Sequence, residues 1–201
     1  MNVCLIETGL ANMASVAAAF RRLGASVTVT REPAAVEAAA RVVLPGVGAF
    51  GPAMETLHAA GLVDVLRARI TALRPTLAIC LGMQLLAKGS DESPGVEGLG
   101  ALATHVSAFP DTVSTPQFGW NRVDFEGPDR IDESAYVYFA NSFRITHPPP
   151  GWRASWSVYG GRFCAALQRG DVLACQFHPE LSGAYGERLL AQWLFGETTP
   201  C

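Results

Sequence analysis

A cysteine between a predicted strand and a predicted helix is the strongest chemical feature of the sequence. A short apolar run ends at Cys80, and Leu81 and Gly82 then open a segment with helical spacing. This is the layout of a nucleophile elbow, in which a tight turn presents a reactive side chain at the edge of a sheet. The start of the new helix favours negative charge on the sulfur and points free N–H groups toward a developing oxyanion. Taken alone, a buried structural cysteine would be the commoner explanation.

A histidine and a glutamate two residues apart follow another apolar run near the end of the chain. In an extended backbone, His178 and Glu180 point to the same side, and Pro179 favours that backbone in the residue before it. The carboxylate can then orient the imidazole, as the third member of a nucleophilic triad does. Alone, such a pair would more often lie on the surface. Together with Cys80, it predicts a Cys-His-Glu triad.

A glycine-rich turn supplies a third element. Pro45, Gly46, Val47 and Gly48 directly follow an apolar run. The two glycines leave the backbone free to aim, or to swing, the N–H of Val47, and a second oxyanion donor is a natural use of such a group. An ordinary glycine-rich turn is the alternative.

These motifs follow short apolar strands, and the first half of the chain alternates such strands with helices. We predict strands at 2–6, 26–30, 41–44 and 76–79, and helices at 12–23, 33–40 and 52–74. This order favours a parallel sheet covered on both faces. After about residue 95, short β runs dominate (122–125, 136–139, 152–158, 163–167 and 172–177) before a closing helix at 185–195. We therefore predict one α/β domain over 1–201, with a mostly parallel central sheet and an additional antiparallel β portion in the second half.

Composition excludes several classes of protein. The chain has 201 residues, 49% hydrophobic and 16% charged, with a net charge of −3. Disorder requires low hydrophobicity and high net charge, nucleic-acid binding favours a basic balance, and a membrane helix needs about 20 apolar residues. None of these patterns occurs, and no C-x-x-C pair indicates a metal site. We expect a soluble, cytoplasmic protein without cofactor or metal, part of whose weakly charged surface is covered by a partner.

In their order along the chain, the glycine-rich turn, the segment CLGMQ from Cys80 and the segment HPE from His178 resemble the class I (triad) glutamine amidotransferases. The resemblance spans nearly the whole chain and implies the fold of that class. Four segments, ETGLAN at 7–12, PGVG at 45–48, FGWN at 118–121 and QFHPELSG at 176–183, are similar to the family of glutaminase subunits of imidazole glycerol phosphate synthase. That enzyme belongs to histidine biosynthesis.

The resemblance implies hydrolysis of glutamine to glutamate and ammonia through a thioester on Cys80. His178 would act as general base and acid, and Glu180 would orient it. The remaining implied site residues are Leu81, Val47 and Gly48 for the oxyanion hole, and Gln84, Glu92 and the backbone around Ser142 and Phe143 for the amino-acid end of glutamine. Because glycines flank Val47, we also expect the glutaminase activity to be gated by a partner.

The same resemblance implies a TIM-barrel cyclase as the partner in a heterodimer. The cyclase would receive the ammonia and make imidazole glycerol phosphate and an aminoimidazole carboxamide ribonucleotide. Asn12, Trp120 and Asn121 are the predicted interface residues, and for Trp120 a place in the core is an equal alternative. Neither nucleic acid nor a membrane is implied.

Three positions depart from the family pattern, and three alternatives remain. Ala78 stands where the elbow usually has Gly, Asn141 replaces a common His, and Leu181 replaces a residue that is often basic. From Ala78 we expect strain rather than inactivity. The alternatives are the glutaminase of another class I enzyme, such as pyridoxal phosphate synthase, a thiol hydrolase acting without a synthase partner, and a catalytically silent amidotransferase-like binding subunit. The FGWN segment argues against the first, and the intact triad argues against the last.

Overall fold

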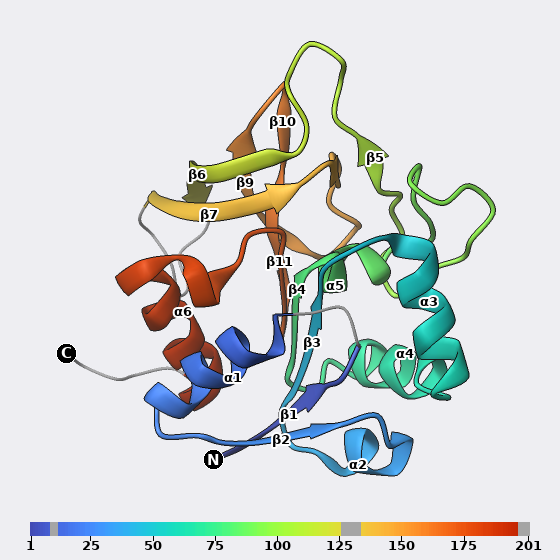
Figure 1. Cartoon of the computed structure of the whole chain (residues 1–201), viewed down its shortest axis with the longest axis vertical. Coiled ribbons are helices and arrows are strands. Elements are labelled where there is room, and N and C mark those ends of the chain that lie inside the picture. The colour runs from blue at the N-terminus through green and yellow to red at the C-terminus, as the bar shows by residue number, and fades with distance from the viewer. Residues whose placement is uncertain (9–11, 126–133, 197–201) are drawn as a thin grey trace.

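A nine-stranded sheet forms the centre of the protein in a computed structural model that describes residues 1–8, 12–125 and 134–196 (Figure 1). Its strand order is β2-β1-β3-β4-β11-β10-β9-β6-β7. The parallel half comprises β2 (Ser26–Thr30), β1 (Asn2–Ile6), β3 (Val42–Gly46), β4 (Thr76–Cys80) and β11 (Val172–Cys175). The antiparallel half comprises β10 (Arg162–Arg169), β9 (Arg153–Val158), β6 (Gln117–Phe125) and β7 (Ala135–Asn141). The predicted antiparallel portion thus extends the parallel sheet itself. A separate small sheet pairs β5 (Ser107–Ala108) with β8 (Phe143–Arg144).

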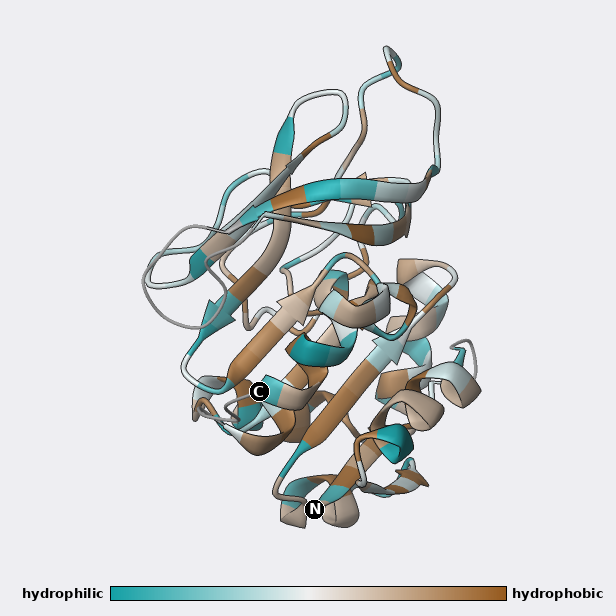
Figure 2. Ribbon diagram, turned by 90° about the vertical axis from the view of Figure 1, so that its left-hand side faces the viewer, coloured by the Kyte–Doolittle hydropathy of each residue, from teal (hydrophilic) through white to brown (hydrophobic). Residues whose placement is uncertain are grey.

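Helices cover both faces of the parallel half (Figure 1). One face carries α1 (Met13–Arg22) and α6 (Gly183–Phe195), and the other carries α2 (Pro33–Ala38), α3 (Phe50–Ala59), α4 (Val63–Thr71) and α5 (Leu81–Leu85). Every residue of β3 and β4 is buried, as expected for strands packed on both sides, and Figure 2 shows the central strands as hydrophobic along most of their length. Within the described residues, no helix is long and apolar enough to cross a membrane.

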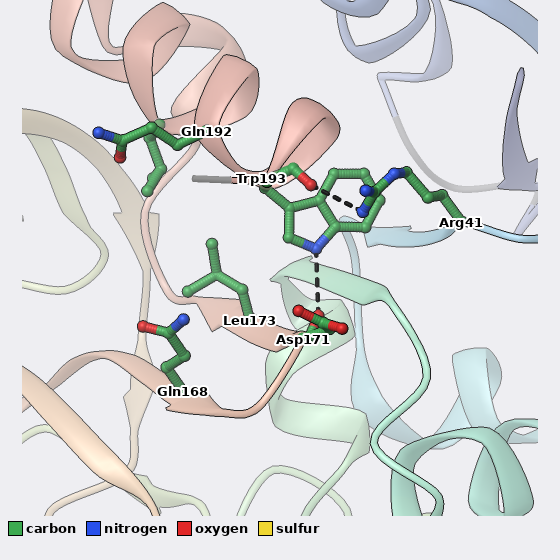
Figure 3. Close-up of a pocket in the computed structure, with 8 residues that line it drawn as sticks. Arg41, Gln168, Asp171, Leu173, Gln192 and Trp193 are labelled. Carbon is green, nitrogen blue, oxygen red and sulfur yellow. Dashed lines mark hydrogen bonds between the residues drawn. The ribbon is translucent and has the colours of Figure 1, made fainter. Parts of the chain in front are cut away.

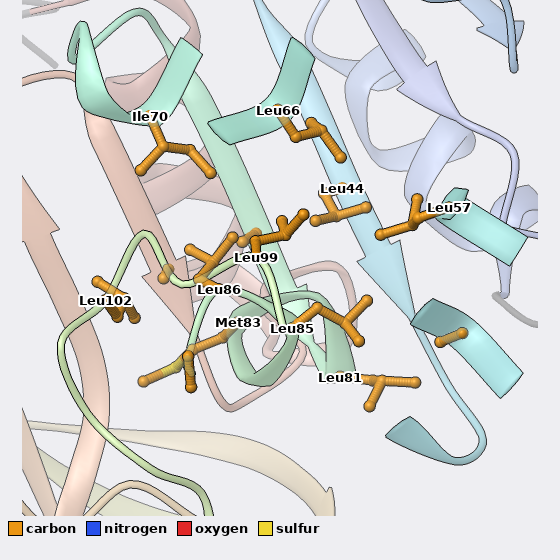
Figure 4. Close-up of a cluster of buried hydrophobic side chains, with 14 of the residues drawn as sticks. Leu44, Leu57, Leu66, Ile70, Leu81, Met83, Leu85, Leu86, Leu99 and Leu102 are labelled. Atoms are coloured by element: carbon orange, nitrogen blue, oxygen red, sulfur yellow. The ribbon is translucent and has the colours of Figure 1, made fainter. Parts of the chain in front are cut away.

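The core on the α3, α4 and α5 face includes Leu81, the residue that follows the predicted nucleophile (Figure 4). It joins Leu44 of β3 and Leu66 of α4 to Leu81 and Leu85 of α5, all buried. On the other face, Phe20 of α1 and Trp193 of α6 meet edge to face, with their ring centroids 5.8 Å apart. The short helix α5 is therefore held by a large apolar core, which is the support that a strained turn before it requires.

The predicted single helix over 52–74 is wrong, because the structure has two helices there. Gly61 lies between α3 and α4 with φ +67°, a conformation that glycine adopts without strain. The N–H of Gly61 donates to the carbonyl of His58 at 3.0 Å, and that of Leu62 donates to Leu57 at 2.9 Å. These two bonds form a Schellman motif, which ends a helix. Two smaller corrections concern α2 and β11, which both end two residues earlier than predicted.

Candidate active site

Cys80 ends β4 and stands at the N-cap position of α5, so the predicted strand-to-helix turn is present. Its backbone has φ 53° and ψ −112°, and among the described non-glycine residues only Leu73 shares a positive φ. Such a conformation costs about 1–3 kcal/mol and persists only where the surrounding packing enforces it. Ala78, where strain was expected, occupies a regular strand position opposite Leu44 and Ala174. The strained backbone of the elbow lies at the cysteine itself.

Two glycines allow the ends of β3 and α5 to meet beside Cys80. A Cβ on Gly82 would collide with the carbonyl oxygen of Leu44, and one on Gly46 would lie 2.9 Å from the Cβ of Leu81. The parallel register places Gly46 opposite Cys80. Val47 follows immediately and is half exposed, and Gly48 has φ +97°. The predicted oxyanion residues therefore lie at the ends of neighbouring strands, next to the sulfur.

The predicted base and acid form a buried hydrogen-bonded pair. Nδ1 of His178 lies 2.8 Å from Oε1 of Glu180, and their side chains are only 7% and 2% exposed. The extended backbone that the sequence predicts holds for His178 alone, since Pro179–Leu181 forms a single turn of 3-10 helix. Two bonds anchor the histidine backbone: its N–H donates to the carbonyl of Tyr138 at 2.9 Å, and its carbonyl accepts from the Ser182 hydroxyl at 2.6 Å.

The surroundings of His178 raise its pKa to about 10. Burial opposes this shift by disfavouring the charged ring, but interactions with Cys80 and with Glu180 stabilise the protonated form by more. The surroundings of the imidazole thus favour its protonated form. A ring in this state can protonate a leaving amine, which is the general-acid half of the chemistry of a nucleophilic triad.

The sulfur of Cys80 has two further neighbours within the protein. It lies 3.9 Å from the carbonyl oxygen of Ala140 on β7 and 3.7 Å from Nε2 of Gln176. Gln176 is not among the predicted site residues, although it is fully buried. Its position two residues before His178 is the signal that could have found it, because residues so spaced in an extended segment share a side.

Gln84, a predicted substrate residue, is buried and already bonded within the protein. Its Nε2 donates to the carbonyl of Phe143 at 3.1 Å and to Oε1 of Gln176 at 3.0 Å. Asn141 donates to the same carbonyl of Phe143 at 3.0 Å. The carbonyl of Ser142 accepts from the N–H of Phe109 at 3.2 Å. The structure thus brings Gln84, Asn141 and Phe143 together, with Gln176 joining them to Cys80.

Glu92, the other predicted substrate side chain, contacts the start of α3. Its Oε2 accepts from the N–H of Phe50 at 2.7 Å, and the hydroxyl of Ser93 accepts from the N–H of Gly51 at 3.0 Å. These acceptors satisfy N–H groups that a helix leaves unpaired at its first turn. Because Phe50 is only two residues after Gly48, this contact places Glu92 close to the glycine-rich turn, and Glu92 is not a freely solvated loop acid.

The three predicted interface residues differ in their surroundings. Asn12 is exposed and caps α1, its Oδ1 accepting from the N–H of Ser15 at 3.3 Å. Trp120 is 56% exposed, so a place in the core is excluded. Asn121 is the next residue of β6 and points to the opposite face, where it donates to the carbonyl of Val158 at 3.0 Å.

Leu181, a departure from the family pattern, is 39% exposed. Residues 9–11 of the ETGLAN segment lie outside the described residues.

Two hollows lie away from Cys80. One lies where β11 begins, at the end of the strand opposite to His178, and its lining includes Arg41, Asp171 and Trp193 (Figure 3). There Arg41 donates to the carbonyl of Trp193 at 2.8 Å and ties α6 to the sheet. The other, with a volume of about 290 Å³, lies between α1 and α6 and reaches Glu180. In the part of the chain that the structure describes, no cluster of three His, Cys, Asp or Glu could hold a metal ion.

Comparisons with known proteins assign the chain to a family. The family model described as Glutamine amidotransferase class-I matches residues 4–196. A protein of Symbiobacterium thermophilum named Imidazole glycerol phosphate synthase subunit HisH is 39% identical over 198 residues, covering 95% of this chain and 92% of its own length. The protein of the same name from Escherichia coli K12 is 40% identical over 199 residues, covering 96% and 99%. A solved structure described as a glutamine amidotransferase superposes with a TM-score of 0.77 at 22% identity, covering 96% of each chain, and supports the fold alone. The chain belongs to the class I glutamine amidotransferases and, within them, to the family of the HisH subunits of imidazole glycerol phosphate synthase.

Proposed function

We propose that this chain is the glutaminase subunit of an imidazole glycerol phosphate synthase and hydrolyses glutamine to glutamate and ammonia. One observation carries the proposal: in a chain of this family, Cys80 stands at a strained elbow beside the buried His178–Glu180 pair. The relatives named as subunits of that enzyme are similar to this chain over nearly their whole length.

The proposed reaction has two stages. In the first, the sulfur of Cys80 loses its proton to His178 and attacks the side-chain amide carbon of glutamine. The C–N bond then breaks, and His178 gives its proton to the departing ammonia. In the second, His178 takes a proton from water, which attacks the thioester carbon, and glutamate leaves as the C–S bond breaks and the sulfur regains its proton. The raised pKa of His178 and its bond to Glu180 support the proton-carrying role.

The oxyanion of each tetrahedral intermediate would be held by the N–H groups of Leu81 and Val47, with Gly48 setting the backbone of the turn. One well-aimed donor is worth about 3 kcal/mol, or about 100-fold in rate. The half-exposed Val47 lies between Gly46 and Gly48, so its peptide can reorient without a side-chain penalty at either neighbour. This supports gating by a partner, and equally fast turnover without partner and nucleotide substrate would refute the gating.

An exposed aromatic patch, formed by Phe118, Trp120, Tyr136 and Tyr138, is the proposed docking face for the partner. Phe118, Trp120 and Tyr136 are 73%, 56% and 65% exposed, and the rings of Phe118 and Trp120 lie 5.9 and 6.2 Å from that of Tyr138. Such patches are uncommon on monomers and mark interaction sites. The family name refers to a subunit, and we propose a TIM-barrel cyclase as the partner. The free thiols Cys4, Cys80, Cys164 and Cys175 support a cytoplasmic location.

The decisive experiment measures ammonia released from glutamine by the chain alone, with a cyclase subunit, and with the cyclase and its nucleotide substrate. We expect turnover to rise sharply in the last case and Cys80→Ala to abolish it. No ammonia under any condition would refute the glutaminase function. For the interface, Trp120→Ala should weaken the complex in titration calorimetry, and Asn121→Ala tests whether the other predicted interface residue of β6, which points to the opposite face, contributes as well. Equal affinities for wild type and Trp120→Ala would remove the aromatic patch from the interface.

A further inference from the structure

Gln176, we propose, is a further residue of the catalytic centre: its side-chain amide donates to the sulfur of Cys80 and connects the nucleophile to Gln84. The proposal rests on the proposed function for its consequence in catalysis, but the contact itself is a property of this structure. Gln176 is fully buried directly after β11, and its Nε2 lies 3.7 Å from the Cys80 sulfur.

A backbone carbonyl, which cannot act as a donor, fixes the orientation of the side-chain amides of Gln84 and Gln176. The backbone carbonyl of Phe143 can only accept a hydrogen bond, so the group of Gln84 that faces it at 3.1 Å must be the NH₂. The second hydrogen of that NH₂ requires another acceptor, which Oε1 of Gln176 provides at 3.0 Å. With its oxygen facing Gln84, Gln176 must present its own NH₂ to Cys80. A single backbone carbonyl thus fixes a donor against the sulfur.

This chain of hydrogen bonds also limits how Gln84 can bind glutamine. Both hydrogens of its NH₂ are used within the protein, so only Oε1 of Gln84 remains for a ligand. An oxygen accepts and cannot donate, so Gln84 can receive the substrate's ammonium group but cannot bind its carboxylate. Gln176 connects Gln84 to Cys80 through two hydrogen bonds, in addition to the backbone of α5, which carries Gln84 and begins at Cys80.

For the reaction, an N–H aimed at the sulfur stabilises the negative charge that the sulfur carries when it attacks. Negative charge is on the sulfur when the nucleophile forms and again when the thioester carbon releases it, and hydrogen bonds to a charged partner are the stronger kind. The thiol, by contrast, is 3.9 Å from the acceptor oxygen of Ala140. Gln176 therefore acts in both stages without exchanging a proton.

Two substitutions separate this role from packing. Gln176→Glu keeps an oxygen acceptor for Gln84 and nearly the same volume, but it places an oxygen without an N–H against the sulfur. Gln176→Met removes both contacts. The matched control is Gln117→Met, because Gln117 is also a buried glutamine and neither of its amide atoms has a hydrogen-bond partner in the structure. Thermal unfolding of all three reports the cost to the fold.

The readouts are kcat and KM for glutamine in the complex with the cyclase, and the rate of Cys80 alkylation by iodoacetamide in the chain alone. We expect Gln176→Glu to lower kcat about 10- to 100-fold with KM nearly unchanged, and to slow alkylation. Gln176→Met should lower kcat similarly and also raise KM, while Gln117→Met should change neither rate. If kcat and alkylation in the two Gln176 variants match those of Gln117→Met, the proposal is overturned. Alkylation needs no glutamine, so it tests the contact even if the wild type releases no ammonia.

Discussion

Replacement of Gly82 by alanine should damage catalysis far more than it damages the fold. A Cβ at this position collides with the carbonyl oxygen of Leu44, an atom of the central strand β3 that cannot move aside as a side chain could. To reach an ordinary van der Waals distance, the start of α5 must withdraw from β3 by about 1 Å. The displaced segment includes the N–H of Leu81 and the Cys80 sulfur, so the proposed nucleophile and the proposed oxyanion donor move together.

The expected loss of stability and the expected loss of catalytic rate differ in size. Overpacking of a well-packed core costs about 1–3 kcal/mol of stability. A misplacement of about 1 Å at reacting groups costs about 100-fold in rate. We therefore expect Gly82→Ala to lower kcat by about 100-fold while the protein stays folded and KM for glutamine changes little. The assay is steady-state ammonia release in the presence of the cyclase and its nucleotide substrate, with urea unfolding of the same preparations.

Leu66→Ala is the matched control for stability. Leu66 is fully buried in the core on the same face of the sheet (Figure 4), and truncating it should cost about 2–5 kcal/mol. Leu66 lies on α4 and takes no part in the side-chain hydrogen bonds given above for Cys80 and His178. The kcat of Leu66→Ala should therefore stay near that of the wild type. If Gly82→Ala keeps its full kcat, or if both variants lose kcat in proportion to their loss of stability, the geometric argument is refuted.

Three further predictions concern other parts of the molecule. Arg69 is 1% exposed and donates to four backbone carbonyls, so Arg69→Met should cost about 3–5 kcal/mol in urea unfolding and leave kcat unchanged; a loss below about 1 kcal/mol would contradict this. Ser93→Ala removes the acceptor of the Gly51 N–H at the start of α3, and should cost about 1 kcal/mol and lower kcat without changing KM. The pKa of His178 is raised from 6.5 to about 10, so protonation stabilises the fold below about pH 6.5 and this contribution is lost as pH rises toward 10. Cys80→Ala removes one cause of the shift, so the imidazole NMR titration should move to lower pH and the loss of stability with rising pH should be complete at a lower pH; an unmoved titration would contradict the contact with Cys80.

What the sequence predicts well follows from local chemistry. The apolar runs that became β3 and β4 were predictable because strands buried on both faces need no polar alternation. The elbow at Cys80 was predictable because a strand, a small residue and a helix must follow one another directly along the chain. The break at Gly61 carried a local signal too, but the apolar spacing on both sides of it continues the helical period.

What the sequence could not predict depends on contacts between distant segments. Gln84 and Gln176 lie 92 residues apart, and Glu92 reaches a helix start 42 residues before it. Each of these side chains satisfies a polar group that becomes buried only once the sheet and the loops around it have assembled. A glutamine on a helix and a glutamate in a loop show the same local pattern whether they bind a substrate or a backbone group. Their place in the site therefore follows from the fold.

The strand β7 connects the proposed docking face to the proposed triad, so a partner bound to that face would contact the strand that holds both. Its Tyr138 carbonyl accepts from the N–H of His178, and its Ala140 carbonyl lies against the sulfur of Cys80. On the exposed side of β7, the ring of Tyr138 packs against the ring of Trp120, which lies on the neighbouring strand β6. A protein seated on the aromatic patch would therefore be one strand away from His178 and Cys80, the proposed base and nucleophile. On the proposed function, ammonia would be released at Cys80 beside this strand, and a partner seated on the aromatic patch would cover the apolar face that the chain leaves exposed there.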